Sequence, residues 1–237
     1  MRTFTLKDVE AHYDRTIDYD EINDKTPSHD KRFIDGFAMS NIADGAHILD
    51  VMCRSAKAEE YYHSKLSGLK FASMDVSSRL LREAKKRFLK NKINGKLYKL
   101  TSLDLPFKDN TFDNVISYET IEHLPDPGKI IYEFGRVLKK GGELVLSCPN
   151  TSWDWIHSTV AFLGIHHSEG PHRFVPRNEI ISHMNKAGFK IVKERTSILI
   201  PVGPRPLLRF GEMIEEAVGE GVRRHIALRR YFVCSKK

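Results

Sequence analysis

The chain has 237 residues, which corresponds to one large domain or one domain with an insertion. Hydrophobic residues make up 41% and charged residues 29%, which excludes a disordered chain. No apolar run reaches the roughly 18 residues of a membrane-spanning helix, and we expect no secretory signal because the N-terminal segment lacks an apolar core. Three widely spaced cysteines form neither a disulfide framework nor a metal knuckle, which favours the reducing cytoplasm.

Lysine and arginine outnumber aspartate and glutamate by 38 to 31, and most of the excess lies near the C-terminus. Residues 199–237 carry eight basic and four acidic side chains. Such a surface can attract nucleic acid, an anionic membrane or a phosphorylated substrate. The basic residues form no run with interleaved aromatic residues, so we interpret them as solvated surface and do not expect a nucleic-acid partner.

Apolar segments alternate with helical patterns along most of the chain. The first 40 residues are polar with scattered aromatics, and we expect them to form a helical cap over one edge of a sheet. Strands are predicted at 46–51, 70–75, 96–100, 112–118 and 143–148, with helices at 57–65, 78–91 and 127–140. Ser77 marks the start of the second helix, and Gly141–Gly142 the end of the third.

After an insertion at 151–177, the alternation resumes with a helix at 178–187, a strand at 189–197, a helix at 207–218 and a strand at 225–234. Continuously apolar strands that alternate with helices are typical of a parallel sheet with helices on both faces. We therefore expect a single α/β domain, with the insertion over the mouth of its site.

Two acidic residues stand at the carboxyl ends of successive predicted strands, Asp50 after the first and Asp75 after the second. In open α/β sheets, ligands bind in the crevice beyond these ends, where the strand order reverses. A carboxylate after the second strand can accept hydrogen bonds from both hydroxyls of a ribose. The pair favours a nucleoside-bearing cofactor, although either acid alone could be an ordinary cap.

Four stretches in order resemble the class I S-adenosylmethionine (SAM)-dependent methyltransferases, notably the type 11 and ubiquinone-biosynthesis O-methyltransferases. They are HILDVMC at 47–53, FASMDVSSRLLREAKKRF at 71–88, LDLPFKDNTFDNVISYETIEHLPDP at 103–127 and GRVLKKGGELVLSCPN at 135–150. The resemblance implies a Rossmann-like, seven-stranded, mostly parallel sheet whose last strand is antiparallel. The cofactor-binding residues that it implies are Asp50, Val51, Met52, Asp75, Val76, Ser102, Leu103, Tyr118, Tyr13 and Tyr19.

The first loop departs from the family pattern D-x-G-x-G-x-G. Met52, Arg54 and Ala56 occupy its three glycine positions. Glycine there permits unusual backbone angles and a close approach to the methionine part of the cofactor. Either the bulky side chains point away and the loop still binds SAM, or the pocket is altered. Ser102 also stands near where the family often places an acid against the adenine.

The segment after the fourth strand reads Glu119-x-x-Glu122-His123. If it forms one helical turn, the three side chains share a face and could bind a divalent ion such as Mg²⁺. The arrangement resembles metal-dependent O-methyltransferases, in which a later histidine contributes; His172 is the candidate here, with His166 and His167 as alternatives. If no metal binds, Glu119, Glu122 and His123 could instead be catalytic residues, with His123 as a general base. A purely structural role of this turn is the remaining alternative.

We predict a SAM-dependent methyltransferase that acts on a small or lipid-like acceptor, at oxygen. Three other interpretations stay open: an enzyme that transfers or cyclises the aminocarboxypropyl part of SAM, a binding module without a cofactor, and, less favoured by the charge pattern, a methyltransferase whose acceptor is nucleic acid. The apolar face of 153–163 and the loop 200–208 fit a packed helix, a lid or a peripheral membrane contact. We expect a cytoplasmic protein, with or without association with a membrane.

Overall fold

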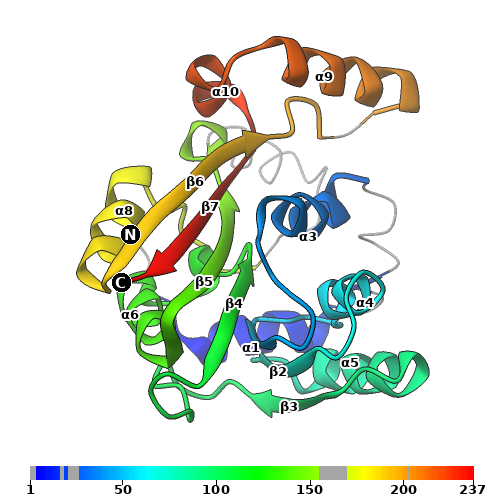
Figure 1. Cartoon of the computed structure of the whole chain (residues 1–237). Coiled ribbons are helices and arrows are strands. Elements are labelled where there is room, and N and C mark those ends of the chain that lie inside the picture. The colour runs from blue at the N-terminus through cyan, green and yellow to red at the C-terminus, as the bar shows by residue number, and fades with distance from the viewer. Residues whose placement is uncertain (1–3, 17–18, 21–26, 155–169, 202) are drawn as a thin grey trace.

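The computed structural model describes residues 4–16, 19–20, 27–154, 170–201 and 203–237 (Figure 1). Its seven strands form one sheet in the order β3-β2-β1-β4-β5-β7-β6. β7 runs antiparallel to both of its neighbours, and the pairs among β1 to β5 are parallel. The predicted Rossmann-like fold is therefore confirmed, and the strand order reverses between β1 and β4.

The elements follow the predicted alternation closely. The strands are β1 His47–Val51, β2 Lys70–Asp75, β3 Gly95–Lys99, β4 Phe112–Tyr118, β5 Leu138–Pro149, β6 Phe189–Ser197 and β7 Arg229–Lys236. The helices are α1 Leu6–Arg15, α3 Pro27–Met39, α4 Lys57–His63, α5 Ser78–Asn91, α6 Pro127–Val137, α8 Arg177–Lys186, α9 Arg205–Ala217 and α10 Glu220–Ile226, with short 3-10 turns at Ile121–His123 and Thr151–Trp153. Ser77 caps α5 as predicted, because its hydroxyl accepts a hydrogen bond from the Leu80 N–H.

Three predicted boundaries are wrong, and one of them is the start of the fifth strand, which was expected at 143 and lies at Leu138. The helix expected to reach Lys140 ends at Val137, because Leu138 already pairs with Phe112 of β4 and the Val137 carbonyl accepts from the Thr111 N–H. The last strand begins at Arg229, not at 225, because residues 220–226 form α10. At the end of the helix before β5, pairing with a distant strand overrides the local helix preference.

The sheet separates two apolar clusters. Helices α1, α6 and α8 lie on one face of the sheet, and α3, α4 and α5 lie on the other (Figure 1). Their buried side chains belong to the two separate clusters, except that Leu80 of α5 joins the cluster of α1. Strand residues alternate between the two faces, as the period of a β-strand requires. Successive strand ends therefore meet at one edge, where α1 and the loops after β1, β2 and β4 come together.

We expect Phe134→Ala to lower the free energy of unfolding by about 3–5 kcal/mol, because the Phe134 side chain is fully buried on α6. Tyr132→Ala on the same helix is the matched control, since Tyr132 is 59% exposed. Urea denaturation of both variants measures the difference. Equal losses would show that the face of α6 assigned to the core is incorrect.

Candidate cofactor site

The loop after β1 has a left-handed backbone at three positions, although none of them is glycine. Met52, Arg54 and Ala56 have φ values of 64°, 54° and 66°, in the left-handed region. For residues with a side chain this conformation costs roughly 1–2 kcal/mol each. The Cys53 N–H donates to the Met74 carbonyl at 2.9 Å, which holds the loop against β2. The three positions identified in the sequence thus share the backbone geometry that glycine favours.

Asp75 lies at the end of β2, directly beside this loop. Its carboxylate is fully buried and accepts the N–H groups of Arg54 and Ser77 at 2.9 and 2.8 Å. Burial raises the pKa of Asp75, while the Arg54 guanidinium acts in the opposite direction. Each carboxylate oxygen can accept a further bond, so binding of the ribose hydroxyls by Asp75 stays a prediction that its hydrogen-bonding capacity allows.

Arg54 turns inward and fills the crevice between the loop, β4 and α1. Its guanidinium donates to the Met52 carbonyl at 3.3 Å, to the Tyr13 hydroxyl at 3.1 Å and to the Glu119 carbonyl at 3.2 Å. The guanidinium also lies 4.5 Å from the centre of the Tyr13 ring and 3.7 Å from the Asp75 carboxylate. Although burial works against the charge, Tyr13, Tyr19 and Asp75 raise the pKa of Arg54, so it stays protonated.

The backbone frame and Asp75 fit a nucleoside cofactor, but the Arg54 side chain occupies the space beside them. Arg54 is only 3% exposed and Met52 only 2%. Of two surface hollows among the described residues, one lies between α3 and α9 and the other lies against α1 and Pro171, and neither is lined by residues 50–56 or Asp75. A ligand that enters this crevice must therefore displace the guanidinium.

The N-terminal segment closes over the crevice. The Asp14 carboxylate accepts from the Ser77 hydroxyl at 2.6 Å, and Asp20 accepts from the Ser55 hydroxyl at 2.5 Å. The rings of Tyr13 and Tyr19 meet edge to face, 6.0 Å apart. Both tyrosines therefore lie beside the loop, where the resemblance implied them.

The remaining predicted cofactor residues fall into two groups. Asp50, Val51 and Val76 are buried at the strand ends, and burial together with nearby Glu59 raises the pKa of Asp50. Ser102 is exposed and accepts from the Asp104 N–H at 3.0 Å, while Leu103 packs in the core.

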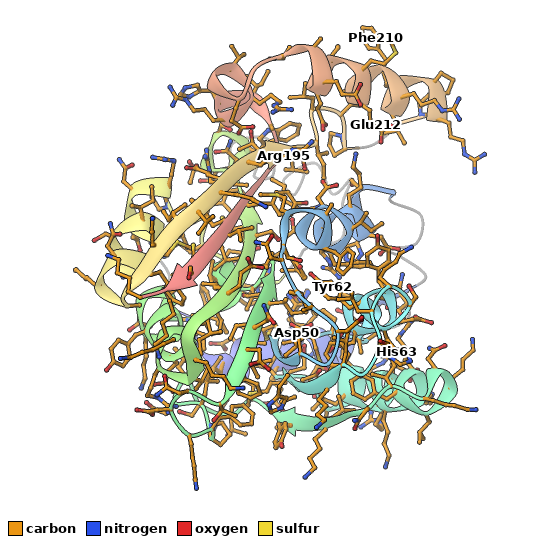
Figure 2. The ribbon with its side chains drawn as sticks, viewed as in Figure 1. Asp50, Tyr62, His63, Arg195, Phe210 and Glu212 are labelled. Carbon is orange, nitrogen blue, oxygen red and sulfur yellow. The ribbon has the colours of Figure 1, made fainter. Side chains whose placement is uncertain are left out.

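Tyr118 does not reach the crevice. Its hydroxyl hydrogen-bonds to that of Tyr62 on the opposite face of the sheet. Ile116, two residues earlier on β4, packs in the same apolar cluster. The two-residue period of the strand therefore directs Tyr118 toward α3 and α4. Figure 2 shows Tyr62 on the inner side of α4.

The predicted metal ligands are not brought together. Glu119 ends β4 with a φ of 51°, and the helical turn starts only at Ile121, so the expected shared face does not form. The Glu119 carboxylate instead accepts from Arg229 Nε at 2.6 Å, whereas His123 bonds to Pro171 and His172 to the Gly170 carbonyl. Within the described ranges, no group of three histidine, cysteine, aspartate or glutamate side chains, Glu122 included, is placed to hold a metal. His166 and His167 lie outside them.

His123 is the imidazole nearest to the crevice. Its Nδ1 lies 3.0 Å from the Pro171 carbonyl, which can only accept, so Nδ1 carries the hydrogen and Nε2 is the acceptor. Burial, together with the positive charge of Arg54, lowers the pKa of His123 to about 3. Its ring centre lies 5.9 Å from that of Tyr13 and 6.1 Å from that of His172. His123 is therefore neutral near pH 7.

The sequence does not indicate that Arg229 belongs to this region, since the basic residues near the C-terminus are interpreted there as solvated surface. Its guanidinium is almost fully buried and bridges Glu119 to the Ser28 carbonyl. Glu119 and Arg229 are 110 positions apart, so no local pattern connects them.

Comparisons with known proteins agree with the motifs. Residues 49–146 match the family described as methyltransferase domain. The demethylmenaquinone methyltransferase of Lactiplantibacillus plantarum is 29% identical over 52% of this chain and 56% of its own length. The ubiquinone biosynthesis O-methyltransferase of Xanthomonas oryzae pv. oryzae is 33% identical over 45% and 44%. The chain thus spans about half the length of these relatives.

The fold also matches that of geranyl diphosphate C-methyltransferase from Streptomyces coelicolor, solved with Mg²⁺, geranyl diphosphate and S-adenosyl-L-homocysteine. The TM-score is 0.69 at 14% identity, over 98% of each chain. At this identity the likeness shows the fold alone. The family match places a methyltransferase domain at residues 49–146, in agreement with the resemblance to the class I family.

We expect Glu119→Gln to destabilise the fold near neutral pH by about 2 kcal/mol, to a smaller extent at pH 3, and to have little effect only near pH 2. Burial favours the neutral acid, but Arg229 and Arg32 outweigh it and hold the pKa of Glu119 at about 2, below the ordinary 4.5. The stabilisation is therefore fully present above pH 4.5 and is lost as the pH falls toward 2.

Urea denaturation at several pH values between 3 and 7 measures this dependence. Glu83→Gln is the control, because Glu83 is an exposed partner of Lys86 and is expected to change stability little at any pH. A cost of Glu119→Gln that does not vary with pH would contradict the assignment.

Proposed function

We propose that this class I methyltransferase domain binds SAM in the crevice framed by residues 50–56 and Asp75, and transfers its methyl group to an oxygen of a small, lipid-like acceptor. The single observation that carries the proposal is the left-handed backbone at Met52, Arg54 and Ala56. Strained backbone of this kind persists where the surrounding structure requires it, and it clusters at binding sites. The left-handed conformation at these three positions, despite the absence of glycine, supports a ligand-binding role for the loop.

Bound SAM would supply a methyl group activated on a sulfonium sulfur. Asp75 would accept hydrogen bonds from the ribose hydroxyls, while Tyr13 and Tyr19 would cover the site and exclude water. His123 would align the acceptor hydroxyl through Nε2, since Nδ1 is held by the Pro171 carbonyl. Its low pKa keeps the imidazole available as a hydrogen-bond acceptor throughout the physiological range. As the acceptor oxygen bonds to the methyl carbon and the sulfur–carbon bond breaks, S-adenosylhomocysteine would be released and the hydroxyl proton would pass to solvent.

Two relatives support a lipid-like acceptor. The name of the first relative identifies demethylmenaquinone as its substrate, and the name of the second places it in ubiquinone biosynthesis. Oxygen as the methylated atom rests on the second relative and on the neutral His123 near the crevice. We do not include a metal in the proposal, since the predicted ligands diverge in the described part of the chain.

We expect Arg54→Gly to bind SAM and S-adenosylhomocysteine at least tenfold more tightly than the unaltered chain, because the substitution clears the crevice and relieves the left-handed strain. Calorimetric titration measures both affinities. Arg82→Gly, at an exposed arginine of α5, is the matched control and should leave them unchanged.

Asp75→Asn in the Arg54→Gly background should lose most of the gained affinity, because the amide cannot replace a carboxylate as a double acceptor. Circular dichroism verifies that each variant folds. If Arg54→Gly is folded and binds neither ligand, the proposed cofactor site is incorrect and the interpretation as a binding module without a cofactor gains support.

We expect turnover of SAM with prenylated hydroquinones to give S-adenosylhomocysteine and an O-methylated product, identified by mass spectrometry. His123→Ala should lower kcat at least tenfold without changing the affinity for SAM, since the imidazole aligns the acceptor only. His183→Ala on α8 is the control. Consumption of SAM without a methylated product would favour the aminocarboxypropyl reaction instead.

A further inference from the structure

Helices α9 and α10 lie together beyond the ends of β5 and β6, outside the two layers that cover the sheet (Figure 1). Their connection to the carboxyl edge is direct. The Asn150 side-chain amide, just after β5, donates to the carbonyls of Arg224 and Ala227 at 2.9 and 3.0 Å, and Trp153 Nε1 donates to the Ile226 carbonyl at 2.8 Å. This pair of helices is therefore attached to the edge that carries the cofactor site.

One side of α9 faces the body of the protein. Gly211 lies against Ile200, and the buried Glu215 carboxylate accepts from the Leu199 N–H at 2.8 Å. Glu212 forms an ion pair with Lys31 of α3 at 3.0 Å. These contacts determine which side of the helix remains outside.

The outer side of the two helices carries a strip of exposed apolar side chains beside exposed arginines. Leu207, Phe210 and Met213 are 42%, 55% and 67% exposed at a spacing of three, and Val222 and Ile226 of α10 are 56% and 47% exposed. They make up five of the nine large exposed apolar side chains in the described parts of the chain. Figure 2 shows Phe210 pointing away from the body, whereas Glu212 points toward α3. Such clustering is more than the scattered exposure of an ordinary surface.

The charges left unpaired around this apolar side are mainly positive. Three of the four acidic residues of 199–237 are engaged: Glu212 by Lys31, Glu215 by the Leu199 N–H, and Glu220 by Arg223 and Thr196. Only Glu216 has no such partner among the described residues.

Arg205, Arg209 and Arg224 are all exposed, and no carboxylate of the described residues forms an ion pair with them. Arg205, Arg209 and Met213 are each four positions apart, so they form one ridge of α9 next to Phe210. An apolar strip with an arginine border is the pattern of a helix that lies in a membrane interface.

We infer that the outer side of α9 and α10 is a docking surface for an anionic lipid bilayer. Leu207, Phe210 and Met213 enter the boundary between headgroups and acyl chains, and the arginines contact lipid phosphates. Nucleic acid matches the arginines but not the apolar strip between them. Docking through this surface holds the carboxyl edge against the bilayer, and it requires neither a bound cofactor nor an acceptor.

Flotation of the whole chain with phosphatidylcholine vesicles, with and without phosphatidylglycerol, tests the inference. We expect binding only to the anionic vesicles, weakened by salt because the arginines act through charge. Phe210→Ser with Met213→Ser should reduce partitioning at least tenfold. Arg205→Gln, Arg209→Gln and Arg224→Gln should each reduce it roughly fivefold.

The matched control lies on α5, at the other end of the molecule (Figure 1). Leu89→Ser removes an apolar side chain that is 72% exposed, and Lys85→Gln and Lys90→Gln remove exposed charges. These variants should float like the unaltered chain.

Absence of binding to anionic vesicles, or equal losses in the α5 controls, would overturn the inference. The inference would also be overturned if sedimentation showed that two copies of the chain associate through the apolar strip and flotation showed no binding to vesicles. Because flotation needs no SAM, its failure is distinguishable from failure of the proposed methyl transfer, which is measured by titration without lipid.

Discussion

The buried positive charge of Arg54 constrains the whole carboxyl edge of the sheet. A guanidinium removed from water must be surrounded by acceptors, and truncating one partner of a buried ion pair typically costs several kcal/mol. Here the acceptors come from four separate parts of the chain: the first loop, the end of β2, the end of β4 and α1. The position of each part therefore depends on the others.

Glu119 connects this arrangement to the far side of the sheet. Its carbonyl accepts from Arg54, and its carboxylate accepts from Arg229 of β7, which in turn donates to the Ser28 carbonyl. The left-handed backbone of Glu119 directs its two acceptor groups to different arginines. Movement of Arg54 out of the crevice would thus remove one of the contacts that join α1 to β4, while the pair with Arg229 could remain. The Arg54 side chain thus joins the N-terminal helix to the ends of β2 and β4.

The same edge carries the surface through which we infer contact with a bilayer. Asn150 and Trp153 hold α10 directly after β5, so the docking helices and the crevice are attached to adjacent strand ends. A lipid-like acceptor that stays in the membrane would have a short path to such a site. None of the helices in the described part of the chain is long and apolar enough to cross a bilayer.

The sequence by itself determined the sheet, most element boundaries and the strand-end positions of Asp50 and Asp75, because alternating apolar segments, the Ser77 cap and the motif spacing are local signals. It also identified Met52, Arg54 and Ala56 as the unusual positions of the loop. Only the tertiary structure decided that Arg54 turns inward, that Tyr118 points to the opposite face, and that Glu119 pairs with Arg229 instead of joining a metal site. Those outcomes depend on contacts between residues far apart in the chain: Arg54 with Tyr13, Tyr118 with Tyr62, and Glu119 with Arg229. Such contacts form only when the fold brings the strand ends and the N-terminal helix together, so no pattern along the sequence could reveal them.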